Sequence, residues 1–300
     1  MGNAEFIKEI ESRGISFSAD EPMSKHTTFK IGGRADIFVL PRSEEELIFA
    51  VNAAKRTKTP FFVCGKGSDL LVSDNGIEGA VICLNEMKGI IIDKENVTVA
   101  AGQSVQSLCL EVQKAGLSGL QFAYGIPGTV GGAIYMNAGA YGGEFSDCTN
   151  AVKYLDESGE IKEAKREELN FGYRTSAFQK NKGIILSAQL KLSSGDPDKI
   201  LREMNGYLSR RKEKQPLEYP SAGSVFRRPE GNFAGTLIEK SGLKGEKVGG
   251  AEVSKKHAGF IVNTGGATSK DVKTLIERIQ KKVLKDSGVA LQREVIYIGR

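Results

Sequence analysis

Cysteine is scarce in this 300-residue chain, and its spacing argues against two kinds of site. The four cysteines, Cys64, Cys83, Cys109 and Cys148, form no Cys-x-x-Cys pair and have no histidine close by in the sequence. Zinc sites and disulfide frameworks are recognised by such spacings. The sequence therefore predicts neither a metal site nor a disulfide framework, but reduced thiols.

Long apolar runs are also missing. No run reaches the length of about 20 residues that spans a membrane. The N-terminus lacks the basic region and apolar core of a secretory signal, and Phe6 stands where a myristoylation signal has Ser or Thr. We therefore expect a cytoplasmic protein without a membrane segment.

Charge of one sign is not strongly in excess. The formal net charge is +5, the isoelectric point is about 8.8, and the lysines are scattered along the chain. This balance favours anionic small molecules over nucleic acid as partners. With 40% hydrophobic residues over 300 positions, the chain can bury a core and is expected to form two or three globular domains.

Glycine, in contrast, is concentrated between Gly125 and Glu144, where seven of the 20 residues are glycine. The residues between them are mostly small or apolar, which does not fit a solvated linker. Two interpretations stay open at this point. The stretch is either a loop laid over a large, partly apolar cofactor, or a set of tight turns between buried strands.

Another glycine loop, Gly65–Val72, lies earlier in the chain and is therefore the first glycine loop; it follows the short strand expected at residues 61–64. Its third glycine position is Leu70 and no helical pattern follows, so it does not match the dinucleotide-binding fingerprint. Lys66 is followed by Gly67, which excludes a Walker P-loop. What remains is either an ordinary turn or a nest of N–H groups that binds a pyrophosphate.

The hydrophobic and turn patterns along the chain predict a mixed α+β protein. Helices are expected at residues 4–13, 43–55, 104–115, 197–212, 234–240 and 269–285. Strands are expected at residues 35–40, 61–64, 80–84, 89–92, 97–101, 152–155, 161–163, 184–192, 247–253, 259–263 and 294–298. Residues 14–25 are expected to be a polar connection, and Ser193–Pro197 is the strongest boundary signal.

The two glycine loops together resemble the FAD-binding pair of the vanillyl-alcohol-oxidase-type (PCMH-type) flavin fold. More closely, the chain resembles the UDP-N-acetylenolpyruvoylglucosamine reductase (MurB) family. Four further segments carry that resemblance in the family's order: residues 26–35, 171–176, 222–229 and 291–295. The chain departs from the family's usual residues at Thr175, often aspartate, and at Gln292 and Arg293, often glutamate and proline.

The resemblance implies a two-part PCMH-type FAD-binding region and a separate α/β substrate-binding domain. We expect the first FAD-binding part at residues 1–87, the second at residues 88–195 and the substrate-binding domain at residues 205–290. The terminal segment, residues 291–300, is expected to return near the site.

The resemblance also implies an activity, the NADPH-dependent reduction of the enolpyruvyl group of UDP-N-acetylglucosamine enolpyruvate to UDP-N-acetylmuramate. This reaction belongs to peptidoglycan precursor synthesis, and hence to cell-wall biogenesis, cell shape and cell division. Arg174 and Glu294 match the groups that stabilise the enolate, and Ser224 matches the proton donor. Taken alone, the same residues would be a surface cation, a solvated carboxylate and a turn hydroxyl. We expect all three in one pocket.

Cofactor and substrate contacts follow from the same resemblance. FAD is expected to bind non-covalently, and NADPH is expected to be the co-substrate. The protein is expected to be a monomer. The expected FAD contacts are Gly65, Lys66, Gly67, Ser68, Asp69, Leu70, Gly125, Ile126, Pro127, Gly128, Thr129, Gly132, Ala133, Asn137 and Gly139. The expected contacts to the UDP-sugar are Tyr141, Tyr173, Lys214 and Arg228.

Two alternatives from other functional classes stay open. A flavin oxidase of the same fold would act on an alcohol or hydroxy acid, and many such enzymes tether FAD through histidine; His26 and His257 are the only candidates. A non-catalytic nucleotide-sugar-binding protein would be colourless when purified.

Overall fold

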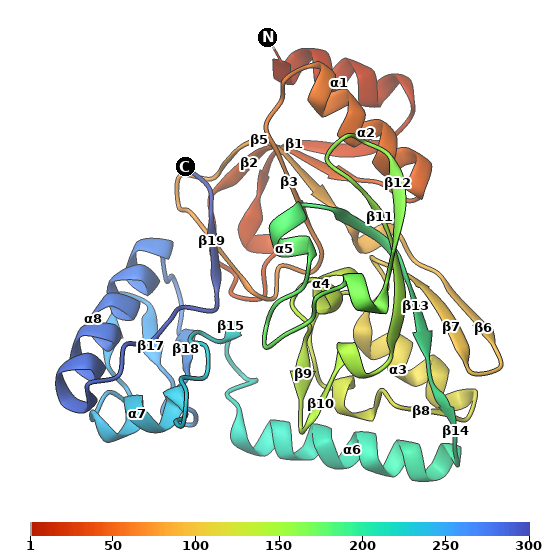
Figure 1. Cartoon of the computed structure of the whole chain (residues 1–300). Helices are drawn as coiled ribbons and strands as arrows, with labels where there is room; N and C mark the ends of the chain where they lie inside the picture. The colour runs from red at the N-terminus through yellow and green to blue at the C-terminus, as the bar shows by residue number, and fades with distance from the viewer. Residues whose placement is uncertain (1) are drawn as a thin grey trace. The chain divides into compact units, whose positions relative to one another are not determined.

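The structure is a computed structural model that describes residues 2–300 (Figure 1). The chain divides into two compact units, each assembled from three segments. Unit 1 comprises Met1–Ser18, Phe38–Lys66 and Gly79–Arg211. Unit 2 comprises Ala19–Ile37, Gly67–Glu78 and Lys212–Arg300. The three-part division at residues 87 and 195 stays a prediction.

The larger sheet of unit 1 has five antiparallel strands in the order β12-β11-β13-β7-β6. Their bounds are β6 Ile90–Asp93, β7 Asn96–Ala100, β11 Thr149–Leu155, β12 Ile161–Lys165 and β13 Ile184–Lys191. The predicted 152–163 hairpin is confirmed, with Leu155 opposite Ile161. Smaller pairs are formed by β9 Gly139–Ala140 with β10 Gly143–Glu144, and by β8 Leu117–Ser118 with β14 Ser193–Ser194.

A second sheet has the strand order β1-β2-β5-β3, and the boundaries between the units fall inside β1, β2 and β5. Its strands are β1 Ser16–Pro22, β2 Arg34–Leu40, β3 Phe61–Cys64 and β5 Ile77–Cys83. The prediction of a polar connection at residues 14–25 was wrong. Its residues 16–22 form the edge strand β1, which has no buried residue and therefore lacks an apolar pattern.

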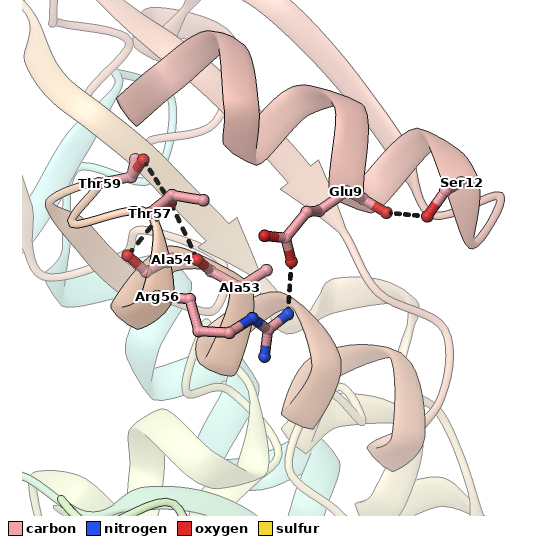
Figure 2. Close-up of polar contacts among 7 residues, drawn as sticks. All are labelled: Glu9, Ser12, Ala53, Ala54, Arg56, Thr57 and Thr59. Carbon is pink, nitrogen blue, oxygen red and sulfur yellow. Dashed lines mark hydrogen bonds and ion pairs between the residues drawn. The ribbon is translucent and has the colours of Figure 1, made fainter. Parts of the chain in front are cut away.

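Helices α1 Gly2–Ser12 and α2 Glu44–Arg56 pack together in unit 1. Figure 2 shows the polar contacts near the end of α2, where Arg56 donates to the Glu9 carboxylate and the Thr57 hydroxyl contacts Ala53, Ala54 and Thr59. The start of α2 is as the sequence predicted, because the Ser43 hydroxyl accepts a hydrogen bond from the Glu46 N–H. The other helices of unit 1 are α3 Val105–Lys114, α4 Val130–Tyr135, α5 Phe178–Asn181 and most of α6 Pro197–Lys214.

Unit 2 is built on a four-stranded antiparallel sheet in the order β15-β18-β17-β16, with α7 Ala234–Lys240 and α8 Ser269–Ser287 beside it (Figure 1). The strands are β15 Ser221–Ser224, β16 Lys247–Val248, β17 Ala251–Val253 and β18 Phe260–Asn263. The predicted single strand at 247–253 was wrong, because Gly249 takes a φ of +53° and Gly250 packs against the Ala267 backbone, so the chain reverses there. The apolar stripe of α8 is buried as predicted.

One long-range pairing in unit 2 joins the C-terminal strand to a segment in the first third of the sequence. Strand β4 Leu70–Val72 pairs in parallel with β19 Ile296–Ile298, and the Ile296 N–H donates to the Asp69 carbonyl at 2.9 Å. The terminal strand therefore lies beside the last three residues of the first glycine loop.

Candidate active site

The first glycine loop begins where β3 ends, and each of its glycines is required by a close approach. A Cβ atom on Gly65 would lie 2.2 Å from the Thr129 hydroxyl oxygen. Gly67 has a φ of +61°, and a Cβ there would lie 2.3 Å from the His26 carbonyl oxygen. Because no side chain fits at either position, both residues must be glycine.

The contact between Gly65 and Thr129 joins the two glycine loops within unit 1. Thr129 is 3% exposed and is the N-cap of α4, with its hydroxyl accepting a long hydrogen bond of 3.4 Å from the Gly132 N–H. A helix inside the glycine-rich stretch was not predicted. It holds Ala133 in a buried position, whereas Gly132 is exposed.

Several glycines of the second stretch are explained by packing. A Cβ on Gly131 would lie 2.9 Å from that of Ala101, and one on Gly143 would lie 2.6 Å from the Phe122 ring. Gly128 and Gly142 have positive φ values of +153° and +89°. The tight-turn interpretation therefore holds for part of the stretch, and the cofactor interpretation stays a prediction.

Both loops carry backbone N–H groups that are available to an anion. Among residues 2–300, the N–H groups of Lys66, Gly67, Gly125, Gly128 and Thr129 make no hydrogen bond to the protein. Gly67 and Thr129 are buried, and a buried N–H without an acceptor is costly. Ile126 is already used, since its N–H donates to Ala123 at 2.8 Å, and Pro127 has no N–H. Phosphate oxygens would supply the missing acceptors.

Lys66 and Asn137 are polar side chains of the two glycine loops, and both belong to unit 1. The Lys66 ammonium group is 3.4 Å from the Ser104 hydroxyl. Asn137 is fully buried with a φ of +42°; its amide donates to the Gly172 carbonyl at 3.1 Å and its side-chain oxygen accepts from the Ser146 N–H at 2.9 Å. Asn137 therefore connects the glycine stretch to the loop that carries Arg174.

Arg174 is fixed against the glycine stretch. Its φ is +54°, its carbonyl accepts from Gln179 at 3.0 Å, and its guanidinium donates to the Gly139 carbonyl at 3.1 Å. The neighbouring Tyr173 ring is 52% exposed and lies under the guanidinium, 5.4 Å from ring centroid to Cζ. A left-handed arginine is uncommon, and the surrounding bonds hold it in this conformation.

Tyr141 also has a left-handed φ, +54°, and is 40% exposed. Its ring stacks on Tyr207 of α6 at a centroid distance of 4.7 Å. Arg211, one turn further along α6, lies against Gly125, and burial lowers the pKa of its guanidinium from the ordinary value. Neither Tyr207 nor Arg211 was predicted from the sequence, because both lie in an ordinary helical pattern.

Ser224 and Glu294 are brought together within unit 2, although 70 positions separate them. The Glu294 N–H donates to the Val225 carbonyl at 2.8 Å, and Phe226 and Arg293 form an antiparallel bridge. The Ser224 hydroxyl donates to the Phe226 carbonyl at 3.2 Å. Two of the three predicted catalytic residues therefore lie on adjacent segments, while Arg174 belongs to unit 1.

His257 lies close to Ser224, which the sequence did not predict. A Cβ on Gly259 would lie 3.0 Å from His257 Cε1 and 3.4 Å from Ser224 Oγ. The His257 Nδ1 accepts from the Gly259 N–H at 3.1 Å, and burial lowers the pKa of the imidazole. A lone histidine 33 positions from the serine leaves no sequence signal of this contact.

Lys214 and Arg228, the other predicted substrate contacts, are exposed side chains of unit 2. Lys214 ends α6, and Arg228 lies over the Phe233 ring at 4.1 Å. Ser68 and Asp69 complete the first loop, and Leu70 begins β4. Within residues 2–300 there is no cluster of three potential metal ligands, and no helix is long and apolar enough to cross a membrane.

Comparison with known proteins gives consistent matches along the chain. Residues 215–298 match the family model described as the C-terminal domain of UDP-N-acetylenolpyruvoylglucosamine reductase, and residues 35–165 match one described as an FAD binding domain. The chain is 46% identical to the UDP-N-acetylenolpyruvoylglucosamine reductase of Caldanaerobacter subterraneus over 98% of its length and 97% of that protein. It is 47% identical to the Clostridium botulinum protein of that name, over 93% and 92%. The crystal structure of the Thermus caldophilus enzyme aligns with a TM-score of 0.80 at 37% identity, covering 94% of this chain and 98% of that one.

Proposed function

Because the chain belongs to the UDP-N-acetylenolpyruvoylglucosamine reductase family, we propose that it uses NADPH to reduce the enolpyruvyl group of UDP-N-acetylglucosamine enolpyruvate, giving UDP-N-acetylmuramate. The observation that carries this proposal is the 46% identity, which extends over both units rather than over the flavin-binding part alone. The product is a precursor of peptidoglycan.

FAD fits the residues of the two glycine loops. The unpaired N–H groups of Lys66 and Gly67 and the Lys66 ammonium offer partners to a pyrophosphate, and neither loop contains a histidine or cysteine for covalent attachment. When bound, FAD accepts a hydride from NADPH and delivers a hydride to the β-carbon of the enolpyruvyl group. We assign the pyrophosphate to Gly65–Asp69 and the ring system to the neighbourhood of Gly125–Gly139.

Ser224 is the proposed proton donor to the α-carbon. Its hydroxyl proton is held by the Phe226 carbonyl at 3.2 Å, a long and therefore weak bond that leaves the proton transferable. The enolate carbon is strongly basic, so position matters more than an acidic hydroxyl. The neutral His257 nearby places no competing positive charge beside the serine at neutral pH.

Arg174 and Glu294 are proposed to stabilise the charge that develops on the substrate carboxylate. A guanidinium whose backbone and side chain are both fixed, as in Arg174, loses little freedom when the charge develops. A carboxyl group beside a substrate carboxylate has its pKa raised, which would let Glu294 donate a hydrogen bond. Tyr141, Tyr173, Lys214 and Arg228 are proposed contacts to the UDP-sugar. We further propose that the protein is a cytoplasmic monomer.

Two measurements test this function and separate it from the alternatives. The purified protein should be yellow and should release all of its flavin on acid precipitation, whereas an oxidase tethered through His26 or His257 would retain it. NADPH consumption should require the enolpyruvyl UDP-sugar. A colourless protein, or NADPH oxidation that this substrate does not accelerate, would contradict the proposal.

A further inference from the structure

Two of the four cysteines are neighbours at the base of the first glycine loop. Cys64 is the last residue of β3 and Cys83 the last of β5, and the two are paired in the parallel register. Side chains of paired residues on parallel strands point to the same face of the sheet. The neighbouring thiol raises the pKa of Cys64 and lowers that of Cys83.

The pair is also connected to the first glycine loop. The next residue after Cys64 is Gly65, whose carbonyl oxygen is 3.6 Å from the Cys83 sulfur. Gly65 in turn has no free space on the side of Thr129, where a Cβ would lie 2.2 Å from the hydroxyl. A displacement of Cys64 therefore moves a glycine that is tightly packed between two elements of unit 1.

We propose that Cys64 and Cys83 form a modification site, at which a peroxide oxidises the pair to a disulfide that weakens the binding of FAD. The second half of this statement rests on the proposed function. The strand spacing of about 4.8 Å lies within the range of Cα separations found across disulfides. The Cβ atoms must approach to about 3.8 Å, so the bond draws Cys64 and Gly65 toward β5.

The chemistry needs one equivalent of peroxide. The Cys83 thiolate attacks one peroxide oxygen, an S–O bond forms, the O–O bond breaks, and the leaving oxygen departs as hydroxide. The Cys64 thiol then attacks the sulfenic sulfur of Cys83, and the S–S bond forms as water leaves. Two thiols are oxidised, one peroxide is reduced to two water molecules, and the S–H that faces the Gly65 carbonyl is lost.

Access to the pair comes through the sheet edge. Cys83 is fully buried and Cys64 is 8% exposed, but β3 is the outer strand of its sheet. An edge strand is bonded on one side only and opens at lower cost than a central strand. Cys109 and Cys148 are also buried, but burial raises the pKa of both thiols, that of Cys148 to about 12, so they are poorer nucleophiles.

The test uses the full-length protein with Cys109→Ala and Cys148→Ala, which keeps only the proposed pair. Treatment with hydrogen peroxide should remove both thiols, lower the mass by two hydrogen atoms and produce a peptide that joins residues 64 and 83. The dissociation constant of FAD, measured from the flavin that passes an ultrafiltration membrane, should be at least about tenfold higher for the oxidised protein than for the reduced one. Dithiothreitol should restore the original binding.

The controls are Cys83→Ala and Cys64→Ala, each in the same background, which leave one thiol and should retain flavin under peroxide. The proposal is overturned if the two thiols survive peroxide, if they go separately to sulfinic acids, or if the disulfide forms and flavin binding stays the same. A protein that never binds flavin would refute the proposed function instead, and the mass and thiol measurements would still report on the pair.

Discussion

The contact between Gly65 and Thr129 allows a quantitative prediction about how the two glycine loops are held together. In Gly65→Ala the new methyl group would lie 2.2 Å from Thr129 Oγ1 and 3.0 Å from Cγ2, so one of the two loops must move. Thr129 is buried and caps α4, and its branched side chain has few rotamers. Overpacking of this kind costs about 1–3 kcal/mol in the free energy of unfolding.

A double-mutant cycle isolates this contact. Thr129→Ala alone should cost about 1–2 kcal/mol, for a weak cap and a buried methyl group. In the double variant the alanine at 65 gains the space that the threonine occupied. The total cost should therefore be smaller than the sum of the single costs, by about 1–2 kcal/mol.

The free energy of unfolding is measured by urea unfolding of the flavin-free proteins. The amount of flavin that each purified variant retains is measured separately. Gly206→Ala is the matched control, because it makes the same chemical change in α6, where nothing lies within 4 Å of the new Cβ. It should stabilise the protein by about 0.5–1 kcal/mol. Additive costs in the cycle, or a Gly65→Ala variant as stable as the parent protein, would refute the packing argument.

Three further outcomes are expected. Ser224→Ala should leave reduction of the flavin by NADPH nearly unchanged and slow its reoxidation by the enolpyruvyl substrate by about 10²–10⁴, measured by rapid-mixing absorbance; wild-type reoxidation would remove Ser224 from the mechanism. The Asp74 carboxylate accepts hydrogen bonds from the Ser269 N–H, the Ser269 hydroxyl and the Lys270 N–H at the start of α8. Asp74→Ala should therefore lower the free energy of unfolding by about 1–3 kcal/mol and lower the urea midpoint. An unchanged midpoint would contradict this. The pKa of Asp271 is held below its ordinary value of 3.8, chiefly by a hydrogen bond from the Thr268 N–H. The contribution of Asp271 to the free energy of unfolding is therefore complete above pH 3.8 and is lost as the pH falls below that value. Asp271→Ala should reduce this loss of stability in acid, measured by unfolding at several pH values, and an identical pH profile would count against the cap.

Much of the fold could be predicted because local patterns agree with it. The Ser43 cap, the apolar stripe of α8 and the hairpin at 155–161 are all set by residues within a few positions of each other. The family was predicted from the two glycine loops and four further segments, and is confirmed. Sequence reasoning failed where tertiary packing decides, as at β1, which buries no residue and forms a strand only because β2 lies beside it.

The candidate site was predictable in part. Spacing identified the loops, and the resemblance identified Arg174, Ser224 and Glu294, whose roles stay predictions. Contacts between residues that are far apart in the sequence could not be predicted. His257 beside Ser224 and Tyr207 against Tyr141 are contacts between residues with no common motif, so only the folded chain brings them together.

The pairing of β4 with β19 has a consequence for the timing of synthesis. Each residue of β4 is paired with one that lies 226 positions later, and β4 has no other strand partner within the described chain. At about 5–20 residues per second, a ribosome needs about 10–45 s to make the intervening chain. During that time the end of the first glycine loop, strand β4, has unpaired backbone groups on both sides. The first glycine loop is therefore expected to be completed late, and the nascent chain is expected to need protection from strand pairing with other chains until Ile296–Ile298 has emerged.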